Sequence, residues 1–228
     1  MQLENKTIAV TGANGNLGRA VVDAALEQGA QVVLLDIAFN DDAPPLPEGR
    51  ATRYVVDLLD QDATDTCFDK IGPIDALCNV AGGFAMGTPA HATTDKDWSV
   101  MFDLNVRTLL HGIRATVPGM LERGRGAIVN IATTAALSGQ ALMAPYAVTK
   151  SAVMRLTECM SEELKDQGIN VNCVMPSIID TPQNREAMPE ADFSAWVSPQ
   201  QLANVICFLV SDAASAVHGA AVPVTNRV

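Results

Sequence analysis

A tyrosine and a lysine four positions apart offer the clearest chemistry in this chain. Both belong to the run Tyr146-Ala147-Val148-Thr149-Lys150. If residues 146–166 form a helix, the two side chains share one face of it. An ammonium group beside a phenol favours the phenolate and lowers the phenol pKa from about 10. The spacing therefore predicts a tyrosine that moves protons near neutral pH, and the alternative is an unreactive pair on a solvated helix face.

A glycine-rich turn, Thr11-Gly12-Ala13-Asn14-Gly15-Asn16-Leu17-Gly18, follows the first expected strand and opens a helix. Gly12 permits the tight turn, Gly15 lets the backbone approach a phosphate, and Gly18 allows close helix–strand packing. The net charge of −11 disfavours nucleic-acid partners. It does not disfavour a dinucleotide, because main-chain N–H groups at a helix N-terminus hold pyrophosphate without basic side chains.

Asp36 closes the second expected strand, 18 residues after Gly18. A carboxylate at this position accepts hydrogen bonds from the adenosine ribose and repels a 2′-phosphate. Ile37 follows it, and no Arg or Lys stands between Gly12 and Gly18. These residues predict NAD(H) in preference to NADP(H). Arg19 is either a cation near the phosphates or a solvated helix position.

Short apolar runs alternate with helical patterns along the whole chain. We expect strands at 7–10, 31–36, 54–57, 76–80, 127–131, 170–174 and 221–224, helices at 17–28, 61–71, 95–123 with an early break, 146–166 and 199–212, and a loop at 40–49. Continuous Val, Ile and Leu runs indicate strands buried on both faces of a mostly parallel sheet. Right-handed crossovers then give a single doubly wound, three-layer Rossmann-type α/β domain over residues 1–228. Pro223 favours an edge position for the seventh strand.

Other features limit the class of protein. The chain has no run of about 18 apolar residues, so we expect no membrane span. Its N-terminal residues lead directly into the first strand, so we expect no signal peptide. The five cysteines are scattered and never form a CxxC pair, which favours buried thiols in the cytoplasm. His91, His111 and His218 lie far apart, so we expect no metal site.

Taken together, the order and spacing of these motifs resemble the short-chain dehydrogenase/reductase family over essentially the whole chain. The matching segments are Asn79-Val80-Ala81-Gly82 after the fourth strand, Asp57 after the third, Asn105 in a helix, Tyr146 with Lys150, and Pro176 to Thr181 after the sixth strand. The resemblance implies that Tyr146 is the general acid/base for the substrate oxygen. It also implies that Lys150 binds the nicotinamide ribose, that Asn105 holds a water linking Lys150 to solvent, and that Thr181 contacts the carboxamide.

The same resemblance implies a full set of cofactor-binding residues. They are Gly12, Asn14, Gly15, Asn16, Leu17, Gly18, Asp36, Asp57, Leu58, Asn79, Ala81, Gly82, Tyr146, Lys150, Pro176, Ile179 and Thr181. Three positions depart from the family pattern. Asn16 stands where most simple oxidoreductases of the family have glycine, and Ser177 replaces another glycine. Thr133 stands where the catalytic serine is usual, so Thr133 fills that role, or Thr134 or Ser138 does, or the site lacks that donor.

Residues 182–198 resemble the substrate lid of dihydropteridine reductases, and Val80-Ala81-Gly82-Gly83 adds to that likeness. Arg185 is either a surface residue or a clasp for a polar substrate. Phe193 and Trp196 either line the substrate site or anchor the lid on the core.

Three functions remain open from the sequence. The first is an NAD(P)(H)-dependent oxidoreductase that transfers hydride between the cofactor and a small alcohol or carbonyl. The second is an enzyme that reduces a quinonoid pteridine, and the third is a non-catalytic dinucleotide sensor. The resemblance implies a homotetramer or homodimer that pairs the helices near 100–123 and 146–166. The apolar stripe Val153, Leu156, Met160 and Leu164 is either core or interface. Substrate identity and stereochemistry stay open.

Overall fold

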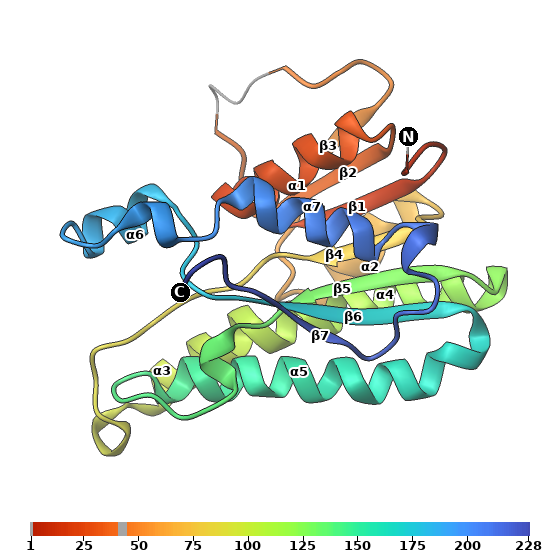
Figure 1. Cartoon of the computed structure of the whole chain (residues 1–228). Helices are drawn as coiled ribbons and strands as arrows, with labels where there is room; N and C mark the ends of the chain where they lie inside the picture. Colours follow the sequence, from red (N-terminus) through yellow and green to blue (C-terminus); the bar gives the residue numbers. More distant parts are fainter. Residues whose placement is uncertain (1, 41–44) are drawn as a thin grey trace.

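The sheet has seven parallel strands. A computed structural model describes residues 2–40 and 45–228. Its strands are β1 (Thr7–Thr11), β2 (Gln31–Asp36), β3 (Ala51–Val55), β4 (Ala76–Asn79), β5 (Gly126–Ile131), β6 (Ile169–Pro176) and β7 (Ala221–Val224). They lie in the order β3-β2-β1-β4-β5-β6-β7, and each neighbouring pair is parallel (Figure 1). This confirms the doubly wound Rossmann-type fold, with β7 at the expected edge.

Helices cover both faces of the sheet. They are α1 (Asn16–Glu27), α2 (Gln61–Ile71), α3 (Asp95–Phe102), α4 (Thr108–Arg123), α5 (Ala144–Leu164), α6 (Pro182–Ala187) and α7 (Pro199–Leu209). In Figure 1, α1 and α7 lie on one face, and α4 and α5 lie on the other. The fold therefore has three layers.

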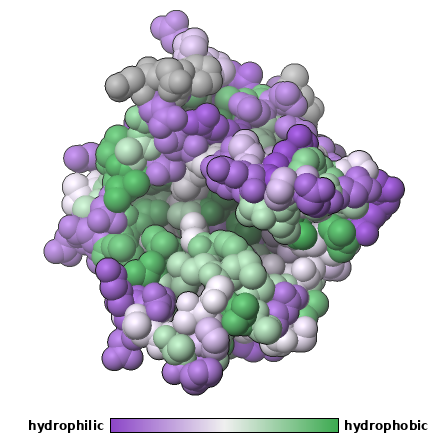
Figure 2. Space-filling view, turned by 90° about the vertical axis from the view of Figure 1, so that its left-hand side faces the viewer, coloured by the Kyte–Doolittle hydropathy of each residue, from purple (hydrophilic) through white to green (hydrophobic). Residues whose placement is uncertain are grey.

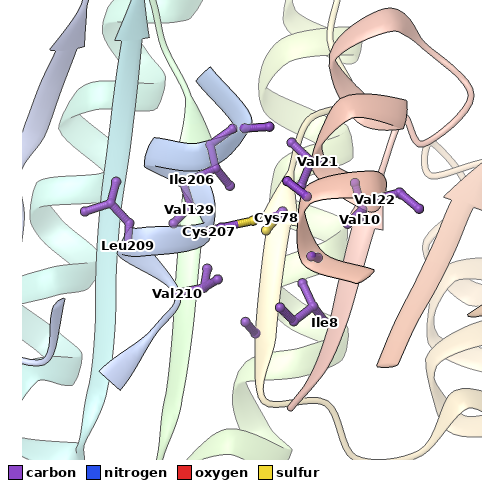
Figure 3. Close-up of a cluster of buried hydrophobic side chains, with 14 of the residues drawn as sticks. Ile8, Val10, Val21, Val22, Cys78, Val129, Ile206, Cys207, Leu209 and Val210 are labelled. Atoms are coloured by element: carbon purple, nitrogen blue, oxygen red, sulfur yellow. The ribbon is translucent and has the colours of Figure 1, made fainter. Parts of the chain in front are cut away.

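Each face has its own apolar core because successive strand residues point to opposite sides. On β1, Ile8 and Val10 pack with α1 and α7, whereas Ala9 packs toward α2, α4 and α5. Figure 3 shows part of the first cluster, in which Val21 and Val22 of α1 and Ile206 and Cys207 of α7 pack with strand residues such as Val10, Cys78 and Val129. The two cores fix the sheet between its helices and hold its carboxyl edge in place.

The third strand differs from the expectation. The sequence pattern predicted residues 54–57, but β3 spans Ala51–Val55. At a sheet edge the main-chain pairing decides the register, and here Ala51 pairs with Val32 and Val55 with Asp36. The side chain of Val55 is 70% exposed, so the apolar residues at 54–56 were a poor guide to where this strand begins and ends. Asp57 consequently lies in the loop after β3.

The other expected strands and helices differ from the observed ones only at their boundaries. Part of the expected loop at 40–49 falls at residues 41–44, which lie outside the described residues. The early break in the long helix is confirmed, because a π-helical segment, Asp103–Arg107, separates α3 from α4. The apolar stripe on α5 proves to be core, as Val153, Met160 and Leu164 are buried. Within residues 2–40 and 45–228, no helix is both long and apolar enough to span a bilayer.

Candidate active site and cofactor cleft

The cleft lies where the strand order reverses. The chain runs outward from β1 to β2 and β3 on one side and through β4 to β7 on the other. The loops after β1 and β4 therefore part at the carboxyl edge, which is where doubly wound sheets bind their ligands. Thr11 at the end of β1 holds the second loop, because its hydroxyl oxygen accepts hydrogen bonds from the N–H groups of Val80 and Ala81, at 3.0 and 3.1 Å. The motif pattern gave no sign of this role of Thr11.

The glycine-rich turn has the backbone that a bound pyrophosphate needs. Gly12 has φ +64°, and a Cβ there would stand 2.8 Å from the main chain of Ala81. A Cβ on Gly18 would overlap the main-chain oxygen of Gly12. Gly15 caps α1 and has no side chain to occupy the N–H groups of Asn16 and Leu17. The turn thus fits a dinucleotide whose phosphates lie over the N-terminus of α1.

Asp36 lies beside this turn. Its carboxylate accepts hydrogen bonds from the N–H groups of Asn14 and Ile37, each at 2.8 Å. The Asn14 side-chain oxygen in turn accepts from Arg19, at 2.8 Å, so the Arg19 guanidinium is held at the same corner of the turn. The Asp36 carboxylate and the Arg19 guanidinium therefore both contact Asn14, and their opposite charges have opposite preferences for a 2′-phosphate.

The loop after β3 forms the far end of the cleft. Asp57 is exposed, and its carboxylate accepts from the N–H of Leu59 at 2.9 Å. Ile37 and Asp57 both line a cavity of about 600 Å³ beside α2. Leu58 is buried, and its main-chain oxygen hydrogen-bonds His111 at 2.8 Å. The structure therefore brings Asp57 close to Ile37, whereas the Leu58 side chain belongs to the core.

Tyr146 stands in the first turn of α5, between an aromatic ring and a hydroxyl. The Phe84 ring meets it edge-on, with the two ring centroids 4.8 Å apart. Burial raises the pKa of the Tyr146 phenol, and a hydrogen bond with Thr133 lowers it by a smaller amount. The single O–H of Thr133 has a second acceptor in the main-chain oxygen of Pro176, at 3.2 Å. Of the three hydroxyl residues left open by the sequence, Thr133 is therefore the one that the structure brings to the phenol.

Lys150 shares a face of α5 with Tyr146 but is buried more deeply. Its ammonium group donates to the main-chain oxygen of Ile131 at 2.7 Å. Burial lowers the pKa of Lys150 to about 8. The phenol pKa lies above its ordinary value and not below it, contrary to the expectation for a phenol beside an ammonium group. Burial disfavours the phenolate, and Thr133 supplies the hydrogen bond that opposes this effect.

The loop after β4 packs tightly against these groups. A Cβ on Gly82 would stand 2.8 Å from Asn105 Oδ1 and 3.3 Å from Lys150 Nζ. The Asn105 oxygen accepts from the N–H of Gly83 at 2.9 Å, and its amide donates to Thr149 at 3.2 Å. Asn105 therefore joins the π-helical segment, this loop and α5. Its side chain is engaged by protein groups, and its expected role with a water stays a prediction.

Asn79 lies inside the sheet rather than in the cleft. Its amide donates to Asn130 on β5 at 2.9 Å, and Asn130 donates to Thr157 on α5 at 3.0 Å. This chain of hydrogen bonds fixes β4 relative to the helix that carries Tyr146. The structure thus gives Asn79 a positioning contact.

The loop after β6 completes the cleft. Pro176 ends the strand, and the hydroxyl oxygen of Thr181 accepts from the N–H of Asn184 at 3.2 Å. The main-chain oxygen of Ile179 accepts from the Asn184 side chain at 2.8 Å. Ser177, which replaces the usual glycine, donates to the main-chain oxygen of Thr225 at 3.0 Å. The serine therefore ties this loop to the chain beyond β7.

The lid begins at α6 and is held by its own side chains. Arg185 forms two bonds to Asp180, at 2.5 and 2.7 Å, and its guanidinium lies 4.8 Å from the centroid of the Phe193 ring. Phe193 packs on Trp196, with ring centroids 4.8 Å apart, and Trp196 is buried. These contacts favour the anchoring role for Phe193 and Trp196, and the Arg185 guanidinium is engaged by Asp180, so its role as a clasp for a polar substrate stays a prediction. Asn16 of the glycine-rich turn also donates to Gln183 of the lid at 2.8 Å, a contact that sequence spacing could not indicate.

A parallel sheet with this strand order and a glycine-rich turn at its reversal defines a dinucleotide-binding α/β protein. The family model "short chain dehydrogenase" matches residues 6–192. Meso-2,3-butanediol dehydrogenase from Serratia marcescens is 32% identical over 98% of this chain and 94% of its own length. The chain belongs to the short-chain dehydrogenase/reductase family.

Solved structures agree with this assignment. A 3-oxoacyl-[acyl-carrier protein] reductase from Brucella melitensis with bound NAD is 29% identical, with a TM-score of 0.89 over 100% of this chain and 92% of that one. ElxO with bound NADP is 25% identical, with a TM-score of 0.88 and coverage of 96% of both chains. The protein is accordingly an NAD(P)-dependent dehydrogenase/reductase that acts on alcohol or carbonyl groups.

Proposed function

We propose that this enzyme interconverts a small ketone or aldehyde and its alcohol, with Tyr146 as the general acid/base. The observation that carries the proposal is the meeting of Tyr146, Thr133 and Lys150 beside the loop at Gly82. The bound nicotinamide supplies or accepts the hydride. The protein groups supply the proton and hold the substrate oxygen.

The phenol pKa favours one direction near neutral pH. Since burial raises it, Tyr146 remains protonated there and is ready to donate its proton to an alkoxide as the charge develops. The Thr133 hydroxyl hydrogen-bonds the same oxygen of the substrate. The Lys150 ammonium, with a pKa of about 8, remains mostly charged and hydrogen-bonds the nicotinamide ribose. We therefore propose that, at neutral pH, the enzyme reduces the carbonyl faster than it oxidises the alcohol.

NAD(H) is the proposed cofactor. The Asp36 carboxylate lies next to the turn and repels a 2′-phosphate, whereas it accepts hydrogen bonds from an unmodified ribose. Arg19 opposes this preference, but its guanidinium is engaged by Asn14. Gly12, Gly15 and Gly18 serve either cofactor equally.

The enzyme is proposed to form a homodimer or homotetramer through α4 and α5. The buried stripe on α5 does not support this, because it is core. Val148 of α5 and Leu121 of α4 support it, since both are large apolar side chains that remain exposed in one copy of the chain. Light scattering of the purified protein tests the assembly state.

A substrate panel tests the reaction. Aliphatic and aromatic ketones, aldehydes and quinonoid dihydropterin are each incubated with NADH or NADPH, and nicotinamide absorbance is followed. We expect turnover of ketones or aldehydes, with NADH preferred. Turnover of the dihydropterin alone would instead support a pteridine reductase, the function that the resemblance of residues 182–198 left open. Cofactor binding with no turnover of any ketone or aldehyde contradicts the proposal.

A further inference from the structure

The wall of the site beside Tyr146 is apolar and exposed. Phe84, whose ring contacts Tyr146, is 56% exposed. Met86 lies two residues further along the same loop and Leu137 lies four residues after Thr133, and both side chains are exposed as well. Burial of such side chains is favourable, so leaving a group of them in water costs free energy. Exposed apolar surface beside a reacting group is typical of a ligand site.

Two loops meet to form this wall. The N–H of Gly87 donates to the main-chain oxygen of Leu142 at 2.9 Å, which ties the segment after β4 to the loop that enters α5. Leu142 itself has φ +65°, a left-handed conformation that a leucine rarely adopts. Its side chain remains exposed on that loop. Strained backbone persists where the surrounding structure holds it, and such residues cluster at functional sites.

The surface view agrees with this arrangement. Figure 2 looks onto the carboxyl edge of the sheet, and apolar patches border the hollow in that face. Phe, Met and Leu side chains have neither strong donors nor strong acceptors for the hydroxyl groups of a sugar or polyol. A polyol placed against them would lose hydrogen bonds to water without replacement.

We propose that the substrate bears an alkyl or aryl group next to its reacting carbon, and that Phe84, Met86, Leu137 and Leu142 cover this group. The inference rests on the proposed function and names its substrate class. The contact between Phe84 and Tyr146 makes the apolar wall continuous with the proton donor. A substrate whose oxygen reaches Tyr146 therefore places its neighbouring carbon atoms on this wall.

The test is a homologous series of methyl ketones, from butanone to octanone, assayed with NADH beside hydroxyacetone and dihydroxyacetone. We expect kcat/KM to rise by up to about fourfold for each methylene that the wall covers. The hydroxylated ketones are expected to be the poorest substrates. Equal kcat/KM along the series, or a preference for the hydroxylated ketones, overturns the inference and leaves the proposed reaction intact.

Serine substitutions test which side chains cause the rise of kcat/KM with chain length. Phe84→Ser and Leu137→Ser both change exposed side chains and are expected to reduce the gain in kcat/KM per methylene. The matched control is Phe208→Ser, because Phe208 is 40% exposed on α7 and lies outside the wall. The control is expected to keep the wild-type dependence on chain length. An unchanged dependence in both wall variants contradicts the assignment of these residues.

A binding measurement separates this inference from the proposed reaction. If no carbonyl in this series or in the wider substrate panel is turned over, the proposed function fails. Calorimetry with the same ketones and NAD⁺ then tests whether the apolar wall binds their alkyl groups, since burial of apolar surface makes the heat-capacity change of binding negative. Affinity that increases with chain length supports the apolar site, and affinity independent of length overturns it.

Discussion

The Lys150 ammonium of α5 donates a buried hydrogen bond of 2.7 Å to the main-chain oxygen of Ile131, the last residue of β5. Lys150 is buried, so one hydrogen bond from protein replaces much of its hydration. The lowered pKa of about 8 reflects the free-energy cost of removing the charged ammonium from water. A buried lysine of this kind destabilises the fold and is consistent with a residue kept for its function.

The stability cost of Lys150 has a definite pH dependence. Its pKa is about 8 in the folded chain, against 10.5 for a fully hydrated lysine side chain. Between these values the unfolded chain binds the proton and the folded chain does not, so stability rises with pH across this window. Below pH 8 the full penalty applies, and it amounts to roughly 3 kcal/mol. Lys150→Met is expected to be more stable than the wild type near pH 7, with the difference shrinking toward pH 10.

Urea unfolding at several pH values measures this difference. Lys96→Met is the matched control, since it removes a lysine from an exposed position on α3. The control is expected to follow the wild-type profile. A Lys150→Met variant that is less stable than the wild type at neutral pH contradicts the buried-charge account.

Thr133 is expected to act through its hydroxyl group. Thr133→Val keeps the branched Cβ but removes the hydrogen bond that lowers the Tyr146 pKa. We expect kcat to fall by about 10²–10³, the usual cost of losing one donor to a developing oxyanion. The basic limb of the pH–rate profile should also move to higher pH, while Thr133→Ser keeps most of the activity. Thr134→Val is the control, and a larger loss in that variant would assign the role to Thr134.

Asp36 is expected to set the cofactor preference. Asp36→Asn removes the charge but keeps an oxygen that can accept from the N–H of Asn14. Removing a charge a few Å from a phosphate is worth about 1 kcal/mol or more, so the ratio of NADPH to NADH affinity should rise by about tenfold. Asp23→Asn makes the same charge change on the exposed side of α1. Fluorescence titration measures both ratios, and equal shifts in the two variants would exclude a local effect.

The hydrogen bond between Asn16 and Gln183 is expected to slow cofactor release. It joins the glycine-rich turn to the lid at 2.8 Å, and a hydrogen bond of this kind contributes about 0.5–1.5 kcal/mol. Asn16→Ala and Gln183→Ala should each speed NADH dissociation a few-fold. Their effects should not add in the double variant, because each removes the same bond. Additive effects in stopped-flow release experiments would show that the two residues act separately.

The sequence predicted those parts of the site that depend on local geometry. Tyr146 and Lys150 share a helix face because they are four residues apart, and the glycine-rich turn meets the β4 loop because parallel strands end at one edge. The edge strand β3 was misplaced because main-chain pairing, and not burial, sets its register. The phenol pKa was also misjudged, since it depends on burial and on Thr133. Contacts such as that between Asn16 and Gln183 join residues far apart in the chain and leave no pattern in the sequence.

The most direct test of the account is Tyr146→Phe, measured with the preferred ketone from the substrate panel. The variant keeps the ring that contacts Phe84 and loses only the hydroxyl. We predict that kcat falls by about 10²–10⁴, while the dissociation constant of NADH stays within about twofold of the wild type. Turnover at the wild-type rate with normal NADH binding would contradict the assignment of Tyr146 as the proton donor.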